Sequence, residues 1–300
     1  MSRHHWGRTI QWVIYKVLWV LTCEGRGTAC RAPTTREIVI LYHFLKYQAE
    51  QSVAVVTLDR PEEENRVSPG LAAELREVCR ATLENEEIYV LVLTGSEGVF
   101  SVGREPLPPE IAAAPAQARL AWLEQLRVAD VLASLPIPVV VAVTGDALDH
   151  GLELALAGDL RIAAEGARFG LTDLTRMGSF PWDGGTQRLP RLVGPAWAND
   201  LILTSRIIDA PEARSIGLVN RVAKPEELLE ETRQLAESIA SGGPIAARYA
   251  KEAITKGMDL SLPQGLWLEA DLNIILQSTA DRAEGLRSFA EKRTPRFTGR

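Results

Sequence analysis

One carboxylate, Glu153, lies inside a stretch that is otherwise apolar, the sequence Gly-Leu-Glu-Leu-Ala-Leu-Ala-Gly at 151–158. A helix of this composition is apolar nearly all round and is expected to be buried. Burying an unpaired carboxylate is costly, so Glu153 should have a partner, a solvent-filled cleft or a chemical role. A solvated position on a half-exposed helix would give the same sequence, but apolar neighbours on both sides favour acid–base chemistry.

The residues that lead into this predicted helix could stabilise a negative charge. An apolar strand and the turn Thr-Gly-Asp-Ala-Leu-Asp-His-Gly precede the helix, which leaves the N–H groups near His150 and Gly151 without intrahelical partners. Such N–H groups can hold an oxyanion. A second turn, Gly-Val-Phe-Ser-Val-Gly-Arg-Glu-Pro at 98–106, could present another N–H, with Arg104 and Glu105 directly after a glycine. Taken singly, each turn is a weak signal.

Alternating strands and helices are predicted to position these groups. Short β-branched runs at 53–61, 89–95, 138–145 and 160–170 predict strands. Helices are predicted at 68–85, where Ser68 caps the helix and Pro69 begins it, and at 116–135. Beyond residue 224 the segments 225–243, 244–260 and 262–293 predict helices with little strand between them. Their apolar faces should be buried against another subunit or against the main domain.

Composition excludes several other classes of protein. The net charge of -6 and the pI near 5.4 argue against a nucleic-acid partner. Cys23, Cys30 and Cys79 form no metal-ligand pattern with the histidines, so we expect no metal and a reducing compartment. Residues 1–35 are basic, and Lys16 interrupts an apolar stretch too short for a membrane span of about 20 residues. We interpret 1–35 as a non-functional or disordered extension, with a poor signal or transit sequence as the alternative.

Six motifs, taken in order, resemble the crotonase (enoyl-CoA hydratase/isomerase) superfamily over about residues 38–300. They are VAVVTLDRPEEEN, VLVLTGSEGVFSVGRE, VVAVTGDALDHGLELALAGDLRIAAEGARFG, DGGTQRLPRLVG, LTSRIIDAPEARSIGLVNRV and SFAEKRTPRF. The resemblance implies an α/β fold, a crotonase-like spiral of ββα repeats over 36–204 that binds acyl-CoA. It also implies a helical oligomerisation region over 205–300, which forms a homotrimer or a dimer of trimers.

The resemblance also implies roles for particular residues. The N–H groups of Arg104 and His150 match the pair that holds the thioester oxygen, and Glu153 matches one catalytic glutamate. Asp173 stands where the second glutamate is expected. Coenzyme A belongs to the substrate and no separate cofactor is implied. The residues implied in substrate or CoA binding are Val102, Gly103, Arg104, Glu105, His150, Gly151, Trp182, Phe289 and Lys292.

The chain departs from the family pattern in three places. Asp149 and His150 stand where glycines are usual, and the imidazole could act on the acyl group or point away. Asp173 is one methylene shorter than glutamate, and a turn or a helix cap would explain it equally well. Asp183 precedes paired glycines, as in family members that act on cyclic acyl-CoAs, and could be a catalytic acid or part of a turn. Trp182 could shape a pocket for a bulky acyl group or be core.

Three functional hypotheses follow. The first is an enoyl-CoA hydratase-type lyase that uses Glu153 and Asp173 on an α,β-unsaturated thioester. The second is an isomerase, hydratase or ring-opening hydrolase of a cyclic acyl-CoA, with Asp183 taking part. The third is an acyl-CoA-binding member with weak catalysis. We expect a cytoplasmic protein without membrane or nucleic-acid partners, or a mitochondrial one if 1–35 is a transit peptide.

Overall fold

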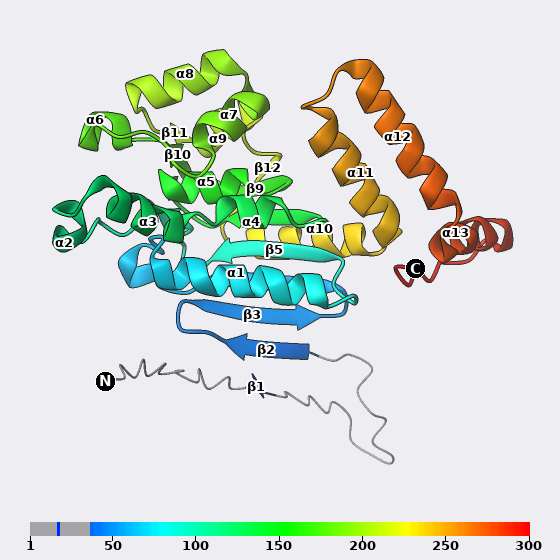
Figure 1. The fold of residues 1–300 in the computed structure, drawn as a ribbon. Coiled ribbons are helices and arrows are strands. Elements are labelled where there is room, and N and C mark those ends of the chain that lie inside the picture. The colour runs from blue at the N-terminus through cyan, green and yellow to red at the C-terminus, as the bar shows by residue number, and fades with distance from the viewer. Residues whose placement is uncertain (1–16, 19–36) are drawn as a thin grey trace, which may run out of the picture.

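A large sheet forms the centre of the molecule. The computed structural model describes residues 17–18 and 37–300 (Figure 1). The strand order of this sheet is β1-β2-β3-β4-β5-β7-β9-β12, antiparallel from β1 to β4 and parallel from β4 onward. The strands are β1 (Val17–Leu18), β2 (Glu37–Leu41), β3 (Leu45–Glu50), β4 (Val53–Leu58), β5 (Val90–Gly95), β7 (Val139–Val143), β9 (Leu160–Ala164) and β12 (Arg221–Ala223).

Four short strands form a second, smaller sheet. Its strands β6 (Ser101–Val102), β8 (Ala147–Leu148), β10 (Arg168–Gly170) and β11 (Ile208–Asp209) lie in the order β11-β10-β8-β6, and β6, β8 and β10 are parallel. The chain therefore repeats one theme three times: a strand of the large sheet, a short strand of the small sheet, and then helix. This repeat brings the segments after β6, β8 and β10 to one edge.

Helices occupy most of the remaining chain. They are η1 (Pro61–Glu63), α1 (Pro69–Glu84), α2 (Pro109–Ala112), α3 (Ala116–Leu126), α4 (Ala129–Ala133), α5 (His150–Leu156), α6 (Asp173–Met177), α7 (Gly185–Val193), α8 (Pro195–Thr204), α9 (Ala210–Ser215), α10 (Leu228–Ala240), α11 (Pro244–Gly257), α12 (Leu262–Gln277) and α13 (Ala280–Glu291). The predicted start of α1 is confirmed, because Ser68 Oγ accepts the Leu71 N–H at 3.1 Å and Pro69 begins the helix.

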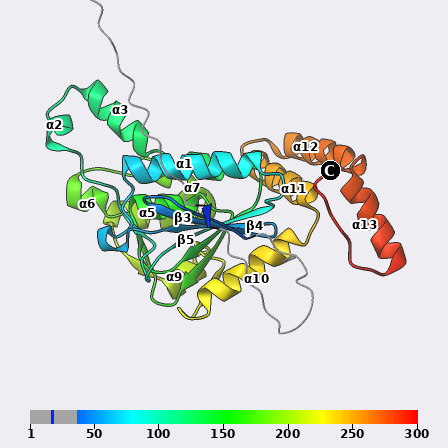
Figure 2. The ribbon, with the colours of Figure 1, turned by 90° about the horizontal axis from the view of Figure 1, so that it is seen from below.

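The central strand β5 is buried on both faces, which explains why its sequence is apolar throughout, whereas β3 alternates between buried and exposed residues. Leu91 and Leu93 face the main core, which includes α1, whereas Val90 and Val92 face a second cluster that contains Ala236 of α10. Figure 2 shows α1 and α10 on opposite sides of the sheet. Successive side chains of a strand point to opposite faces, so a strand covered on both sides reads as a continuous apolar run.

The structure corrects three predicted boundaries. The run 160–170 is two strands, β9 and β10, because the chain turns between them and changes sheet. The stretch 116–135 is two helices, because Arg127 has extended backbone dihedrals (φ -65°, ψ 110°) at the end of α3. The segment 262–293 is also divided, since Thr279 caps the new helix α13 by accepting the Arg282 N–H at 3.2 Å.

The end of α5 distant from His150 is held by a buried arginine. Arg161 of β9 donates from Nε to the Leu218 carbonyl at 2.8 Å and from Nη1 to the Gly158 carbonyl just after α5. Burial lowers the pKa of the Arg161 guanidinium to about 10, although Asp159 opposes this change. The helix that carries Glu153 is therefore fixed at its C-terminal end by hydrogen bonds to neighbouring elements.

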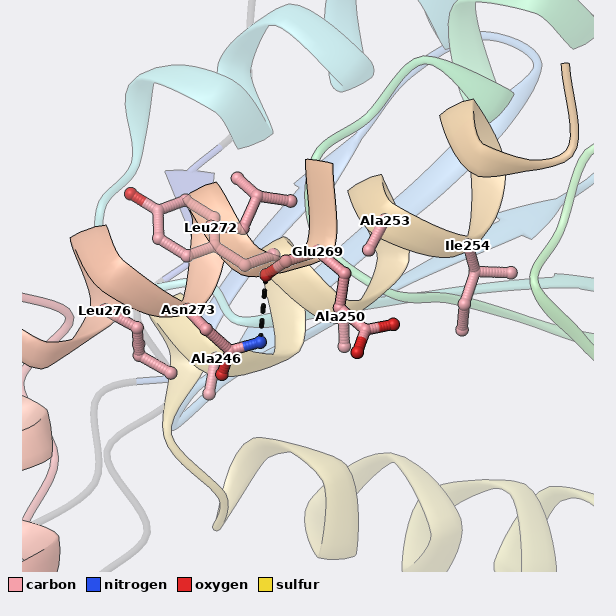
Figure 3. Close-up of a pocket in the computed structure, with 9 residues that line it drawn as sticks. Ala246, Ala250, Ala253, Ile254, Glu269, Leu272, Asn273 and Leu276 are labelled. Atoms are coloured by element: carbon pink, nitrogen blue, oxygen red, sulfur yellow. Dashed lines mark hydrogen bonds between the residues drawn. The ribbon is translucent and has the colours of Figure 1, made fainter. Parts of the chain in front are cut away.

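Helices α11, α12 and α13 stand to one side of the sheet (Figure 1). A cavity of about 260 Å³ lies between α11 and α12, where Ala250 and Leu272 face it (Figure 3). Large apolar side chains on these helices are exposed, including Trp267 at 73 %, Ile274 at 70 % and Phe289 at 86 %. The prediction that this region joins subunits remains a prediction.

The remaining predictions concern the N-terminal extension, the cysteines and membrane-spanning helices. The predicted extension 1–35 lies outside them, apart from Val17–Leu18, which pairs with β2 as β1. Cys23 and Cys30 lie outside them as well, whereas Cys79 is a buried free thiol whose pKa is raised by burial to about 12. Within 17–18 and 37–300, no helix has the length and apolar character needed to cross a bilayer.

Candidate active site

Three predicted site residues follow the ends of three neighbouring strands. Arg104 comes two residues after β6, His150 two residues after β8, and Asp173 three residues after β10. Because these strands are parallel and adjacent, their carboxyl ends lie along one edge of the small sheet. The fold thus brings together groups that lie nearly 70 residues apart in sequence.

The main-chain N–H groups of Arg104 and His150 are available at this edge. The Gly103 N–H donates to the Leu148 carbonyl at 2.8 Å, which joins the two segments directly before these N–H groups. Within the described part of the chain, neither the Arg104 N–H nor the His150 N–H has an acceptor. Two unpaired donors on adjoining segments can bind one oxygen atom that gains negative charge.

The approach of α5 to β6 depends on Gly151. A Cβ atom at this position would lie 1.9 Å from the Ser101 carbonyl oxygen, so a side chain there would force the two segments apart. Close packing at Gly151 therefore brings the preceding N–H group, that of His150, near the end of β6.

Asp149 adopts a backbone conformation that is rare for a residue with a side chain, with φ 50° and ψ -119°. Its carboxylate accepts the N–H and the hydroxyl of Thr172, the latter at 2.9 Å, and the N–H of Asp173 at 3.1 Å. These three hydrogen bonds offset the backbone strain. They also tie the start of α6, where Asp173 lies, to the residue before α5.

Glu153 is buried, as predicted, with 2 % of its surface exposed. Its Oε1 accepts the N–H groups of Asp183 at 2.7 Å and Gly185 at 2.8 Å, and its Oε2 accepts the Trp182 N–H at 3.4 Å. Burial raises the pKa of the Glu153 carboxyl, while nearby His150 and the two closer N–H donors act to lower it. Glu153 is thus held in place by the backbone of 182–185 and takes up a proton more readily than an exposed glutamate.

The imidazole of His150 contacts the carboxylate of Asp183. His150 Nε2 lies 3.2 Å from Asp183 Oδ2, and both side chains are almost fully buried. The same oxygen accepts the N–H groups of Val128 and Ala129, each at 2.7 Å, at the start of α4. Burial acts to raise the pKa of Asp183, but the hydrogen bonds from His150, Ala129 and Val128 outweigh it and lower the pKa.

Asp173 has a more open environment than Glu153. Its side chain is 15 % exposed, and its Oδ2 lies 3.8 Å from Arg104 Nη2. Burial raises the pKa of the Asp173 carboxyl, nearby Asp149 adds to the rise, and Arg104 opposes it. Asp173 therefore combines partial access to solvent with a carboxyl that takes up a proton more readily than an exposed aspartate does.

A cavity of about 350 Å³ adjoins this edge. It has an apolar side, which includes Trp122 and Leu123, and several arginines. The residues that line it are Arg66, Val102, Gly103, Arg104, Glu105, Pro106, Leu107, Trp122, Leu123, Asp149, Asp173, Arg176, Met177 and Ser179. Apolar walls with a few cations suit a ligand that has a hydrocarbon part and phosphate groups.

The predicted residues divide into three groups. Those in 102–105 line the cavity together with Asp173. His150, Glu153 and Asp183 form the buried cluster behind it. Trp182 lines a second cavity of about 720 Å³ with Arg127 and Gly184, while Phe289 and Lys292 lie at the end of α13 and line neither cavity. Roles for Trp182, Phe289 and Lys292 in substrate binding remain predictions.

Sequence reasoning missed several residues of the site. Arg176 lies one helical turn after Asp173, a spacing of three that could have placed both on one face of α6. Arg66 and Trp122 carried no local signal, because the fold alone brings them to the cavity. The departure at Asp149 is visible in the sequence, but its bonds to Thr172 and Asp173 span 23 and 24 residues, so only the fold reveals them.

The free donors at this edge suit an organic anion. Among the described residues, no group of three or more His, Cys, Asp or Glu side chains is arranged to hold a metal. The free N–H groups, Arg66 and Arg176 are all donors. Donors of this kind bind carbonyl, carboxylate or phosphate oxygen.

Comparisons with known proteins give one consistent result. The sequence profile described as enoyl-CoA hydratase/isomerase matches residues 48–300. A crotonyl-CoA hydratase of Syntrophomonas wolfei is 36 % identical over 257 residues, which cover 85 % of this chain and 98 % of the relative. The human mitochondrial enoyl-CoA hydratase domain-containing protein 2 is 38 % identical over 257 residues, which cover 84 % of this chain and 87 % of that protein.

Solved structures agree with this result. The crystal structure of an enoyl-CoA hydratase from Bacillus anthracis superposes with a TM-score of 0.79 at 39 % identity, covering 88 % of this chain and 99 % of that one. The fold predicted from the ordered motifs, a crotonase-like α/β fold followed by C-terminal helices, is therefore confirmed.

Proposed function

Since this chain belongs to the enoyl-CoA hydratase/isomerase family of the crotonase superfamily, we propose that it adds water to an α,β-unsaturated acyl-CoA thioester. Glu153 and Asp173 are the proposed acid–base pair, and the Arg104 and His150 N–H groups are the proposed oxyanion donors. Two relatives of similar length are named as crotonyl-CoA or enoyl-CoA hydratases, which supports a hydration reaction.

One observation carries this proposal. The free N–H groups of Arg104 and His150 belong to residues associated with two carboxyls whose pKa values are both raised by burial: Glu153 lies one turn after His150 in α5, and Asp173 lies 3.8 Å from the Arg104 side chain. A thioester whose oxygen accepts both N–H groups would have its unsaturated carbons close to α5 and α6. A pair of groups with raised pKa values can exchange protons near neutral pH more readily than exposed carboxyls can.

The reaction would proceed by balanced proton transfers. One carboxylate removes a proton from water as the water oxygen forms a bond to the β-carbon. The π electrons of the double bond then move toward the α-carbon and the thioester oxygen, where the Arg104 and His150 N–H groups stabilise the negative charge. The other carboxyl, in its protonated form, delivers its proton to the α-carbon, and the double bond becomes a single bond.

The cavity supports binding of the remainder of the substrate. Its apolar wall, with Leu107, Trp122 and Leu123, offers a surface for an acyl chain or for the pantetheine arm. Arg66 and Arg176 supply positive charge for phosphate oxygens, in a chain whose net charge is -6. No other cofactor is part of the proposal, because coenzyme A enters as part of the substrate.

Turnover of a substrate panel tests the proposal. The wild-type chain should hydrate crotonyl-CoA, observed as loss of the enoyl-thioester absorbance, faster than it converts cyclic dienoyl-CoAs. Preference for a cyclic substrate, or double-bond migration without addition of water, would favour the isomerase or ring-opening alternative. Tight binding of several CoA thioesters by calorimetry, with no turnover of any, would favour the weakly catalytic alternative.

Assembly and location are part of the same proposal. The exposed apolar side chains of α11, α12 and α13 are suited to a subunit interface, and we propose a homotrimer or a dimer of trimers. A cytoplasmic location is proposed, with a mitochondrial one as the alternative, because the relatives named mitochondrial include the human and bovine proteins.

A further inference from the structure

The carboxylate of Asp183 joins three parts of the site. Its Oδ2 binds the imidazole of His150 in α5 and the Val128 and Ala129 N–H groups of α4. Its own main-chain N–H donates to Glu153 at 2.7 Å. The Asp183 side chain thus holds His150 at the start of α5, and the Asp183 main-chain N–H holds Glu153, one turn further along the same helix.

The chemistry of this contact determines which nitrogen of His150 carries the proton. The pKa of Asp183 lies below its usual value, so the carboxylate is ionised at neutral pH and can only accept hydrogen bonds. His150 Nε2 must therefore carry a hydrogen and donate it. His150 Nδ1 is buried without a partner in the described residues, so the bond to Asp183 is the ring's one hydrogen bond there.

We propose that the buried His150–Asp183 hydrogen bond positions the reaction centre by tying the residue that presents an oxyanion N–H to the segment 182–185 that holds Glu153. This inference rests on the proposed function. His150 is thereby a positioning residue through its side chain, in addition to the proposed role of its main-chain N–H. Asp183 is a positioning residue as well, because it is 1 % exposed and does not line the cavity beside Asp173.

Two features of the chain support this role. The family resemblance places glycine where this chain has His150, so a side chain here adds a contact that a glycine cannot make. The segment 182–185 connects to α7 and holds Glu153 through three N–H groups, yet the Glu153 side chain makes no hydrogen bond to His150 itself. Asp183 therefore links the His150 side chain to the segment that holds the Glu153 carboxylate.

Two substitutions of His150 separate positioning from proton transfer by the ring. His150→Ala removes the donor, whereas His150→Gln keeps an N–H near the place of Nε2 and removes the imidazole. His43→Ala, at an exposed histidine outside the site, is the matched control. Each variant is measured for kcat and KM on the best enoyl-CoA, and for hydrogen exchange by mass spectrometry in peptides that contain 182–185.

We expect His150→Ala to lower kcat by about 10²-fold with little change in KM, because misplacing the reacting groups costs about that much. Exchange in 182–185 should be faster than in the wild type, and His150→Gln should restore most of both properties. His43→Ala should match the wild type.

Other outcomes overturn the proposal. Equal loss of kcat in both His150 variants with unchanged exchange would show that the imidazole itself transfers a proton. Wild-type exchange and kcat in His150→Ala would show that the bond positions nothing. If the wild type hydrates no enoyl-CoA, the proposed function fails by itself, and exchange in 182–185 still decides whether His150 fixes this segment. If His150→Ala does not fold, His150→Leu, which fills the same space without a donor, provides the same comparison against His150→Gln.

Discussion

The two proposed carboxyl groups, Glu153 in α5 and Asp173 at the start of α6, lie in contrasting environments. Glu153 is 2 % exposed and accepts hydrogen bonds from three backbone N–H groups of 182–185. The side chain of Asp173 is 15 % exposed, and its Oδ2 forms an ion pair with Arg104 Nη2 at 3.8 Å. Glu153 is fixed by the fold, whereas Asp173 faces a cavity and has freedom to adjust.

The contrast shows how one fold can assign two roles to chemically similar groups. A carboxyl fixed by backbone donors keeps one position, which suits a group that must orient a water molecule. A carboxyl at a cavity wall can follow the substrate, which suits a shorter side chain such as Asp173. In both cases burial raises the pKa, and the two groups differ in how the fold holds them.

Replacing Glu153 should have the largest effect. Glu153→Gln keeps size and one acceptor oxygen but removes the acid–base function, so kcat should fall by about 10²- to 10⁴-fold. The measurement is the rate of crotonyl-CoA hydration, with circular dichroism to confirm the fold. Glu86→Gln, an exposed glutamate outside the site, is the control. Undiminished turnover would remove Glu153 from the mechanism.

Replacing Asp173 should have a smaller effect. Water can reach the cavity and substitute in part for the lost group, so Asp173→Asn should lower kcat by about 10²-fold, the lower end of the range for acid–base residues. Asp173→Glu, which restores the length implied by the family resemblance, should retain more activity than Asp173→Asn. A loss for Asp173→Asn that exceeds the loss for Glu153→Gln would reverse the proposed contrast.

Stability should reveal the strain at Asp149. Asp149→Ala loses the bonds to Thr172 and Asp173 and keeps a side chain at φ 50°, so the free energy of unfolding should fall by about 1–3 kcal/mol. Asp149→Gly loses the same bonds but relieves the strain, and should be less destabilised by about 1 kcal/mol. Urea unfolding measures both. Equal loss in the two variants would show that the backbone here is not strained.

The pH dependence should show the smallest effect. Glu153 has a pKa raised above 4.5, so if its ionised form accepts the proton of water, kcat should decline as the pH falls through a value above 4.5. The effect on stability has the opposite sign. Because the pKa of Glu153 is raised in the folded state, the favourable contribution of this residue to the free energy of unfolding is lost as the pH rises through the folded-state pKa. An acid limb at or below 4.5 in the kcat profile would contradict the burial of this carboxyl in the active state.

Several local features of the candidate site and its fold could be predicted from the sequence. Glu153 in its apolar helix, the N–H groups of Arg104 and His150 after short strands, and the cap at Ser68 all depend on neighbours within a few residues. The bond between His150 and Asp183 spans 33 residues and that between Asp149 and Thr172 spans 23, so only the packing of loops brings them together. The break between α3 and α4 likewise depends on Asp183, which accepts the first N–H groups of α4.

The most direct test of the central claim is the carbonyl stretch of the bound thioester. Infrared difference spectra of crotonyl-CoA labelled with ¹³C at the thioester carbonyl, bound to Glu153→Gln so that it is not consumed, report on hydrogen bonds to that oxygen. If the Arg104 and His150 N–H groups hold it, the labelled band should shift to lower frequency than in water. A band at or above the frequency in water would show that these N–H groups do not bind the thioester oxygen, and would contradict the proposed site.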